Sequence, residues 1–249
     1  MKFPRFTGIE AKAPKSAFAR KWNKLKKNIF VSLLIDLFVI IGSALVLSLI
    51  LKTFLIRSFF IPSGSMMNTL QIDDRIIVNQ LVPDLIPVER GDIVVFKDPG
   101  GWLGTIEEQP KDFFASTAEF FLSAFGLAAP DSSQHLVKRV IGISGDHVVC
   151  CDADGKLQIN GVSITEPYIA DGVKPSETEF DVTVPEGSIW VMGDNRPNSE
   201  DSRYHLELPS KGFVSKEYIV GKAFVLSWPF AHWTWLGNYP DVFKDVPKP

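Results

Sequence analysis

The sequence predicts a mainly β domain of barrel-like or sandwich type, preceded by one transmembrane helix near the N-terminus. Two observations carry this expectation: an unbroken apolar run over residues 29–51, and a series of short apolar runs separated by turn residues beyond residue 56. At 249 residues, the chain is long enough to bury a hydrophobic core.

The apolar run reads IFVSLLIDLFVIIGSALVLSLIL and holds 23 residues with one charge, Asp36. As a helix it is about 34 Å long, enough to cross a hydrocarbon core of roughly 30 Å. A helix buried in a soluble protein is the alternative, which the length of the run disfavours. Asp36 is costly in lipid, so we expect it to lie near the interface, to be paired or to be protonated. No A-x-A-like cleavage site follows the run, which favours a retained anchor over a signal peptide.

Charge is distributed unevenly along the chain, whose net charge is −3. Residues 1–28 hold nine Lys or Arg and one acid, a net charge of +8, whereas the remainder holds 17 basic and 28 acidic residues, a net charge of −11. Nucleic-acid binding is one explanation of a basic arm, but basic flanks of a membrane span stay in the cytoplasm. We therefore expect a cytoplasmic arm (1–28), an anchor (29–51), an extracytoplasmic domain (56–249), contact with the lipid bilayer and no nucleic-acid partner.

Beyond the anchor, short β-rich runs alternate with turn residues such as Asp154-Gly155 and Asn160-Gly161, which favour hairpins. Many short strands at close spacing are typical of an all-β barrel or sandwich. The expected strands cover residues 75–78, 93–96, 135–142, 147–150, 157–159, 180–184, 188–192 and 218–226.

Three features interrupt this pattern. Residues 112–127 carry apolar side chains at helical spacing and predict an inserted helix, either on the β core or on the membrane surface. Residues 228–235 are rich in Trp, which is common at membrane interfaces and equally able to cover the end of a barrel. Cys150 and Cys151 are adjacent, which leaves open a strained bridge between neighbours, an intermolecular bridge or two free thiols.

The sequence lacks the motifs of metal and nucleotide chemistry. Its four histidines have no metal-ligand spacing, and it contains neither a Gly-rich phosphate loop nor a G-x-S-x-G elbow. We expect no metal and no cofactor. Composition alone leaves a Ser-His-Asp triad open.

A serine and a lysine form a more specific candidate pair. Ser63 and Ser65 flank a glycine in a constrained turn, and a serine there suits a nucleophile beside an oxyanion-binding N–H. A free lysine is only about 0.04% neutral at pH 7, but burial lowers its pKa. Lys138 lies in an apolar strand, where alternation places it and Arg139 on opposite faces. Read alone, these features favour an ordinary turn and an edge strand with two exposed bases.

Four segments in order resemble the sequence boxes of bacterial type I signal peptidases. They are S-G-S-M from residue 63, G-D-I-V-V-F-K from 91, K-R-V-I-G-I-S-G-D from 138 and G-D-N-R-P-N-S-E-D-S-R from 193. Four boxes in one order, behind an anchor, are far more specific than any single box. The chain departs from the family at Asn68 and Ser144, where Pro is common, which bears on local loop shape.

The resemblance implies a coiled β-sheet fold for the extracytoplasmic catalytic domain. It also implies a serine endopeptidase. In the reaction, it implies Ser65 as the nucleophile, Lys138 as the general base, and Ser63 with the Ser65 N–H as the oxyanion hole. It further implies that Ser199 orients the lysine and that Met66 lines the substrate groove. Arg139 and Asp201 would form a bracing salt bridge.

The function implied is removal of signal peptides from exported preproteins after small residues, at the bacterial cell membrane. Two alternatives stay open: a specialised Ser/Lys protease that processes pilus or surface proteins, and a membrane-anchored binding module without activity. A sortase-like transpeptidase fits the cysteine doublet poorly. The oligomeric state and the preferred preproteins also stay open.

Overall fold

The computed structural model describes residues 29–104 and 135–249. The chain divides into two compact units, residues 1–49 and 50–249. The expected basic arm (1–28) and the expected inserted helix (112–127) lie outside the described residues.

Helix α2 (Ile29–Phe54) forms from the apolar run and ends at Phe54 rather than at residue 51. Its segment Phe30–Leu49 is long and apolar enough, by length and composition, to cross a membrane. The large side chains of Leu33 and Phe38 are exposed, the latter to 81%. Exposed apolar side chains of this kind are stable in lipid and unfavourable in water.

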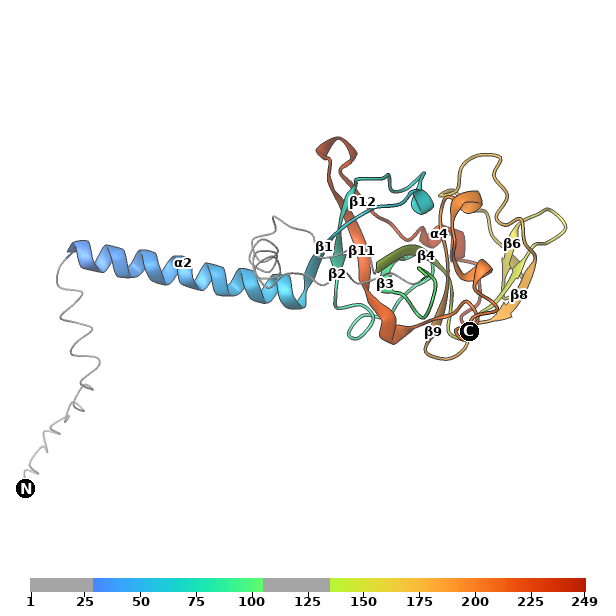
Figure 1. The fold of residues 1–249 in the computed structure, drawn as a ribbon, viewed down its shortest axis with the longest axis horizontal. Coiled ribbons are helices and arrows are strands. Elements are labelled where there is room, and N and C mark those ends of the chain that lie inside the picture. The colour runs from blue at the N-terminus through green and yellow to red at the C-terminus, as the bar shows by residue number, and fades with distance from the viewer. Residues whose placement is uncertain (1–28, 105–134) are drawn as a thin grey trace, which may run out of the picture. The chain divides into compact units, whose positions relative to one another are not determined.

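Two antiparallel sheets make up the β domain (Figure 1). Within the described residues, the larger sheet has the strand order β1-β2-β11-β3-β4-β9-β10, and β12 also pairs with β11. Its strands are β1 (Ile56–Phe60), β2 (Arg75–Asn79), β3 (Ile93–Lys97), β4 (His135–Ile143), β9 (Ser188–Met192), β10 (Val214–Ser215), β11 (Ile219–Trp228) and β12 (Thr234–Trp235).

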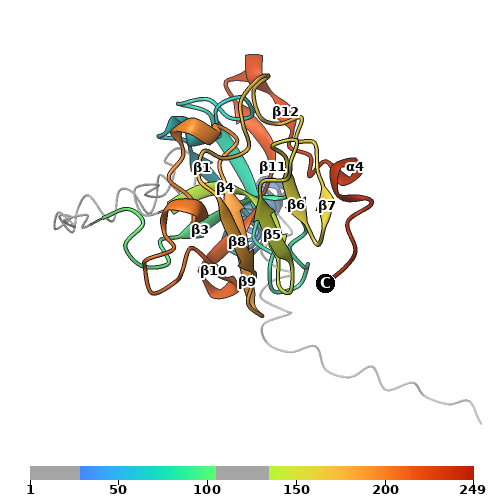
Figure 2. The ribbon, with the colours of Figure 1, turned by 90° about the vertical axis from the view of Figure 1, so that its right-hand side faces the viewer.

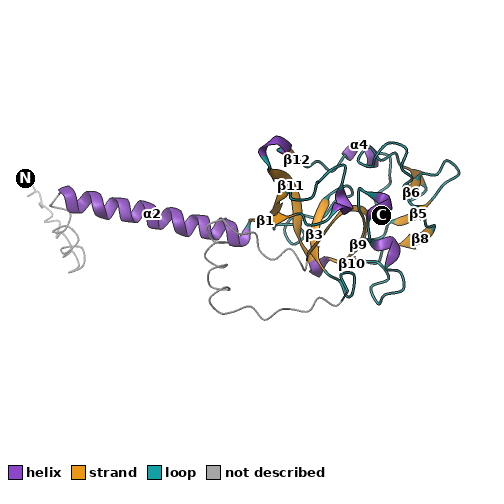
Figure 3. Cartoon of the chain, turned by 45° about the horizontal axis from the view of Figure 1, so that its top comes forward, coloured by secondary structure: helices purple, strands orange, loops and turns teal. Residues whose placement is uncertain are grey.

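The smaller sheet has the order β7-β6-β5-β8, and its strands lie together in Figure 2. They are β5 (His147–Cys150), β6 (Leu157–Ile159), β7 (Val162–Ser163) and β8 (Phe180–Thr183). Loops and short helices connect the strands of the domain (Figure 3). The short helices are η1 (Gly64–Met66), η3 (Arg196–Asn198), η4 (Ser202–Tyr204), η5 (Lys216–Tyr218), η6 (Phe230–His232) and α4 (Pro240–Phe243).

The mainly β fold is confirmed, and each expected strand is present with bounds shifted by a few residues at most. The larger sheet follows an open path whose described end strands are β1 and β10, which is a coiled sheet rather than a closed barrel. Sequence reasoning missed β1, β7, β10 and β12. Three of these strands are two residues long, too short to show a period of two.

The larger sheet is buried on both faces, as β3 shows. Its side chains alternate between two hydrophobic clusters, with Ile93 and Val95 in one cluster and Val94 and Phe96 in the other. Burial on both faces explains why this strand is a continuous apolar run instead of an alternating one. Polar side chains that point from such a sheet into the domain must therefore find partners.

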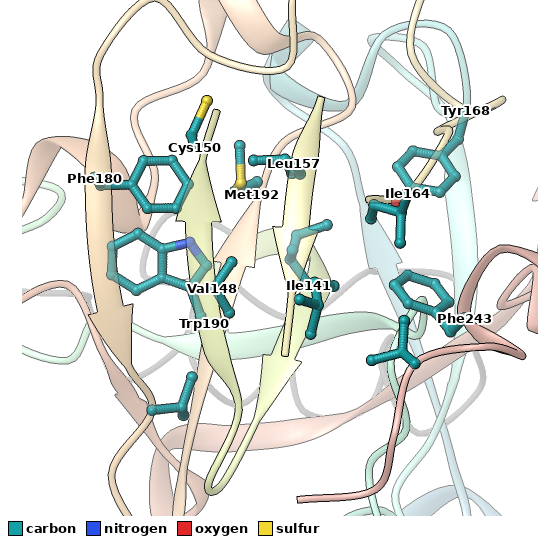
Figure 4. Close-up of a cluster of buried hydrophobic side chains, with 13 residues drawn as sticks. Ile141, Val148, Cys150, Leu157, Ile164, Tyr168, Phe180, Trp190, Met192 and Phe243 are labelled. Carbon is teal, nitrogen blue, oxygen red and sulfur yellow. The ribbon is translucent and has the colours of Figure 1, made fainter. Parts of the chain in front are cut away.

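A third cluster lies between the smaller sheet and the end of β9 (Figure 4). Trp190 is its largest fully buried side chain, and its ring lies 5.2 Å from that of Phe180 and 5.5 Å from that of Phe213. Cys150 belongs to this cluster and is joined to Cys151 by a disulfide between neighbours. Of the three states that the sequence left open for the cysteines, the structure has the bridge between neighbours.

Candidate active site

Ser65 lies in the loop of residues 61–74, which connects β1 to β2. Antiparallel hydrogen bonds hold the base of this loop, from Ile61 N–H to the Asp74 carbonyl (2.9 Å) and from Asp73 N–H to the Ile61 carbonyl (3.0 Å). The tip folds into the 3-10 turn η1, which begins at Gly64. Ser65 is partly exposed.

Lys138 reaches this loop from β4. Its Nζ donates a hydrogen bond of 2.8 Å to Ser65 Oγ, across 73 residues of sequence. The side chain of Lys138 is almost fully buried, at 3% exposed. The structure therefore brings together the two residues to which the family resemblance assigns the roles of nucleophile and base.

Burial lowers the pKa of Lys138 to about 8, because an ammonium group loses its hydration inside the domain. Nearby carboxylates of Asp201, Asp194 and Glu200 oppose this effect, while the positive charge of Arg203 adds to it. A lysine with a pKa of about 8 is neutral in roughly one molecule in ten at pH 7, far more than an ordinary lysine. A neutral amine is able to accept a proton from a hydroxyl group.

The other two serines lie close to this pair. The hydroxyl oxygens of Ser63 and Ser65 are 3.5 Å apart, on the exposed side of the loop. Ser199 Oγ donates to Asp201 Oδ2 at 2.8 Å. A Cβ placed on Gly193 would clash with both the Ser65 carbonyl and Ser199 Oγ, so these two groups lie against the same stretch of backbone.

The expected salt bridge between Arg139 and Asp201 is wrong, because each of the two residues pairs with another partner. Arg139 pairs with Asp194, through Nε to Oδ1 at 2.8 Å and Nη2 to Oδ2 at 2.7 Å. Asp201 instead pairs with Arg203, through Nε to Oδ1 at 2.8 Å and Nη2 to Oδ2 at 2.8 Å. The physical reason is local: Arg203 is two residues from Asp201, and both belong to the loop that follows β9.

Asp201 organises that loop. Besides Arg203, its carboxylate accepts hydrogen bonds from Gly193 N–H (2.9 Å) and from Ser199 Oγ (2.8 Å). All of these groups are buried, so each of their polar atoms needs such a partner. The polar segment 193–203 is therefore an ordered part of the domain.

Met66 differs from its expected place in a substrate groove. Its side chain is 1% exposed and packs in the cluster that contains Phe59, Ile61 and Leu70. Met67, the next residue, is 43% exposed. Met66 thus belongs to the core that supports the Ser65 loop, because these apolar neighbours enclose it.

Sequence reasoning missed two residues that hold the Ser65 loop, Asp194 and Asn195. Thr69 Oγ1 donates to Asp194 Oδ2 at 2.5 Å, and Asn195 donates to the carbonyls of Gly64 and Ser65. Both residues lie in the G-D-N-R box, which marked the region without indicating their partners. Over the described residues 29–104 and 135–249, we find no group of three or more His, Cys, Asp or Glu able to hold a metal ion.

An apolar helix able to cross a membrane, followed by a coiled β domain with a buried lysine against a loop serine, is the arrangement expected of a membrane-anchored serine hydrolase. A family model described as signal peptidase, peptidase S26, matches residues 34–228, more than half of the chain. The chain belongs to this family and is a serine endopeptidase. Helix α2 fits the single span of such an enzyme.

Individual relatives agree with the family model. A probable signal peptidase I of Mycobacterium leprae is 33% identical over 216 residues, which cover 76% of this chain and 74% of the relative. The signal peptidase I of Mycobacterium tuberculosis (strain ATCC 25618 / H37Rv) is 36% identical over 210 residues, which cover 76% and 71%. A crystal structure of a signal peptidase I from Enterococcus faecalis V583 is 27% identical, with a TM-score of 0.34, covering 54% of this chain and 95% of that one.

Proposed function

We propose that the chain removes signal peptides from exported preproteins, with Ser65 as nucleophile and Lys138 as general base. The observation that carries the proposal is the 2.8 Å hydrogen bond between Lys138 Nζ and Ser65 Oγ, in a chain of the signal peptidase family. A nucleophile and its base must lie within hydrogen-bond reach, and these two atoms do.

In the proposed first step, neutral Lys138 accepts the proton of Ser65 Oγ as this oxygen attacks the scissile carbonyl carbon. The carbonyl oxygen becomes an oxyanion, which the Ser65 N–H and the Ser63 hydroxyl group stabilise. The ammonium form of Lys138 then returns the proton to the leaving amine. The products of this step are an acyl-enzyme on Ser65 and the released mature protein.

In the proposed second step, water attacks the acyl carbon while neutral Lys138 accepts a proton from it. As the second tetrahedral intermediate collapses, Lys138 returns this proton to Ser65 Oγ, which releases the signal peptide and restores the Ser65 hydroxyl group. Ser199, fixed on Asp201 by its hydrogen bond of 2.8 Å, is proposed to help to orient the amine of Lys138. Arg139 and Asp201 have a bracing role through their separate partners, Asp194 and Arg203.

The proposed topology is a cytoplasmic arm (1–28), a span (29–51) and a catalytic domain (56–249) on the outer side of the bacterial cell membrane. The charge of +8 on residues 1–28 supports it, because basic flanks of a span remain in the cytoplasm. Ser65 lies eleven residues beyond the last residue of α2, Phe54. A chain of that length keeps the loop within reach of a signal peptide that leaves the bilayer.

The test uses the full-length chain in detergent micelles and a preprotein with an A-x-A site. The wild-type chain should cut after the second Ala, as N-terminal sequencing of the product would show, and a preprotein with Phe at that position should resist cleavage. Ser65→Ala and Lys138→Ala should each abolish cleavage. Lys216→Ala changes an exposed lysine and serves as the matched control.

Three outcomes would contradict the proposal. Normal turnover by Ser65→Ala or Lys138→Ala would exclude the Ser/Lys mechanism. Failure to cut a panel of secretory precursors, with cleavage confined to one pilus or surface protein, would favour the specialised protease instead. An inactive wild-type chain that still binds signal peptides would favour the binding module.

A further inference from the structure

Asn195 donates hydrogen bonds to the two carbonyl groups on either side of the Ser65 Cα. Its side-chain Nδ2 donates to the Gly64 carbonyl at 2.8 Å, and its backbone N–H donates to the Ser65 carbonyl at 3.1 Å. Because the partner of the side chain is a carbonyl oxygen, which only accepts, the amide nitrogen must face it. One residue from outside the loop thus holds both peptide groups that flank Ser65.

The geometry of a peptide group gives this contact a chemical consequence. In a planar trans peptide, the C=O and the N–H point in opposite directions. The Gly64 carbonyl and the Ser65 N–H belong to the same peptide group. When Asn195 Nδ2 fixes the carbonyl on one side, the Ser65 N–H is directed to the other side, away from Asn195.

We propose that Asn195 is a positioning residue that orients the Ser65 N–H for oxyanion binding. The inference rests on the proposed function, in which this N–H stabilises the oxyanion. Donors that are fixed in advance stabilise a developing charge without reorganising during the reaction. Asn195 touches neither the substrate nor the reacting atoms, and acts through the peptide group that it holds.

Asn195 is itself fixed from a part of the fold other than the Ser65 loop. It follows Asp194, whose carboxylate is bound by Arg139 from β4 and by Thr69 from the loop. Its own carbonyl accepts a hydrogen bond of 2.9 Å from Asn198 N–H. Through Asn195, the Gly64–Ser65 peptide group is held in a set orientation relative to strands β4 and β9. Lys138 lies on β4, and the Ser199 loop follows β9.

The loop supplies a second donor to the same carbonyl, since Met67 N–H lies 3.1 Å from the Gly64 oxygen. That bond is internal to the turn η1 and moves with it. It shapes the turn but does not fix the turn relative to the strands. Loss of the Asn195 side chain should therefore leave the turn intact and its peptide plane less well oriented.

The experiment compares Asn195→Ala and Asn195→Asp with the wild-type full-length chain in detergent micelles. Both variants lose the donor, and Asp also places a carboxylate oxygen against the Gly64 carbonyl. We expect kcat on a model A-x-A peptide to fall roughly 10- to 100-fold in the Ala variant, and further in the Asp variant, with KM within about twofold. The midpoint of the pH profile should not move in Asn195→Ala, because this substitution adds no charge near Lys138.

The affinity for a peptide aldehyde inhibitor is a second measurement. A purely structural role of Asn195 would not change this affinity selectively. The hemiacetal that the aldehyde forms with Ser65 carries an oxygen in the oxyanion position, so the affinity of the aldehyde should fall in parallel with kcat. The matching peptide alcohol, which forms no such adduct, should bind wild type and variant equally. The peptide aldehyde therefore reports on the oxyanion site separately from ordinary peptide binding.

Asn68 offers a matched control in the same loop. Its Nδ2 also donates to a backbone carbonyl at 2.8 Å, that of Tyr168, but this carbonyl is remote from the Ser65 peptide. Because Asn68 has a φ of 91°, Gly is the substitution that avoids backbone strain. Asn68→Gly removes one loop anchor of the same kind, and we expect its kcat to stay within about threefold of wild type.

Three results would overturn the inference: a kcat of Asn195→Ala within about twofold of wild type, a comparable loss in Asn68→Gly, or a shifted pH midpoint in Asn195→Ala. A comparable loss in Asn68→Gly would mean that Asn195 only anchors the loop. A shifted pH midpoint would mean that Asn195 acts on the Ser65–Lys138 pair. If Asn195→Ala fails to fold, the near-isosteric Asn195→Asp decides by its kcat on the high-pH plateau and by its affinity for the peptide aldehyde. Loss of activity in Ser65→Ala with normal Asn195→Ala would reject this inference alone, whereas retained activity in Ser65→Ala would reject the proposed function.

Discussion

Lys138 and Arg139 are neighbours on β4 whose side chains leave the strand in different directions and reach the same loop. Lys138 contacts Ser65 directly, at 2.8 Å between Nζ and Oγ. Arg139 holds Asp194, which in turn accepts a hydrogen bond of 2.5 Å from Thr69, four residues after Ser65 in the loop. One dipeptide thus supplies the proposed base and fixes the distance between that base and the nucleophile.

Activity should rise with pH as Lys138 loses its proton. Because burial holds the pKa of Lys138 at about 8, kcat/KM should increase about tenfold per pH unit below pH 8 and level off above it. The measurement is the pH profile of kcat/KM on a model peptide. A flat profile between pH 5 and 9 would exclude a lysine base with this pKa.

The lowered pKa of Lys138 also makes the folding stability depend on pH. In the unfolded chain Lys138 has its ordinary pKa of 10.5, so the unfolded state binds more protons than the folded state between about pH 8 and 10.5. The free energy of unfolding should therefore rise with pH through this window. Below it Lys138 is charged in both states, and the stability gained by deprotonating the buried lysine is absent. Lys138→Met has no buried charge and should be more stable than wild type at pH 7 by about 1–3 kcal/mol.

Denaturant unfolding of both chains at pH 7 and pH 10 would measure this difference. The advantage of Lys138→Met should shrink at pH 10, where the wild-type lysine is mostly neutral. A variant less stable than wild type at pH 7 would show that the hydrogen bond to Ser65 outweighs the desolvation of the ammonium group.

Breaking the buried pair of Arg139 and Asp194 should be costly. Asp194→Asn leaves a fully buried guanidinium without its counter-charge, and we expect the free energy of unfolding to fall by about 3–5 kcal/mol. The control is Asp181→Asn, which removes one partner of the exposed pair with His147 and should change stability little. Equal effects of the two substitutions, measured by denaturant unfolding, would argue against this reading of the buried pair.

Gly193 should tolerate no side chain. Its Cβ would clash with the Ser65 carbonyl and with Ser199 Oγ, so Gly193→Ala must push the two loops apart. We expect at least a tenfold loss of kcat together with a lower melting temperature, since a near-1 Å shift of reacting groups costs about 100-fold. Gly237→Ala, where a Cβ meets nothing within 4 Å, is the control and should behave as wild type. A Gly193→Ala variant with normal activity would mean that the loops do not depend on this close approach.

The sequence was sufficient for the features that depend on local composition. A 23-residue apolar run predicts a helix that can span a bilayer whatever follows it, because its length and hydrophobicity are properties of the segment itself. Period-two runs and turn residues predicted the longer strands for the same reason. The four boxes singled out Ser65 and Lys138, although 73 residues separate them.

Tertiary structure alone decided the pairings. Asp194 and Asp201 lie in the same box, and no local pattern states which of them Arg139 meets; the course of β4 beside β9 brings it to Asp194. It also decided that Met66 is enclosed in the core, and that Asn195 holds the peptide of Ser65. The sequence by itself determined which residues have the chemistry for catalysis, whereas their partners follow from long-range packing, which brings together groups that are far apart along the chain.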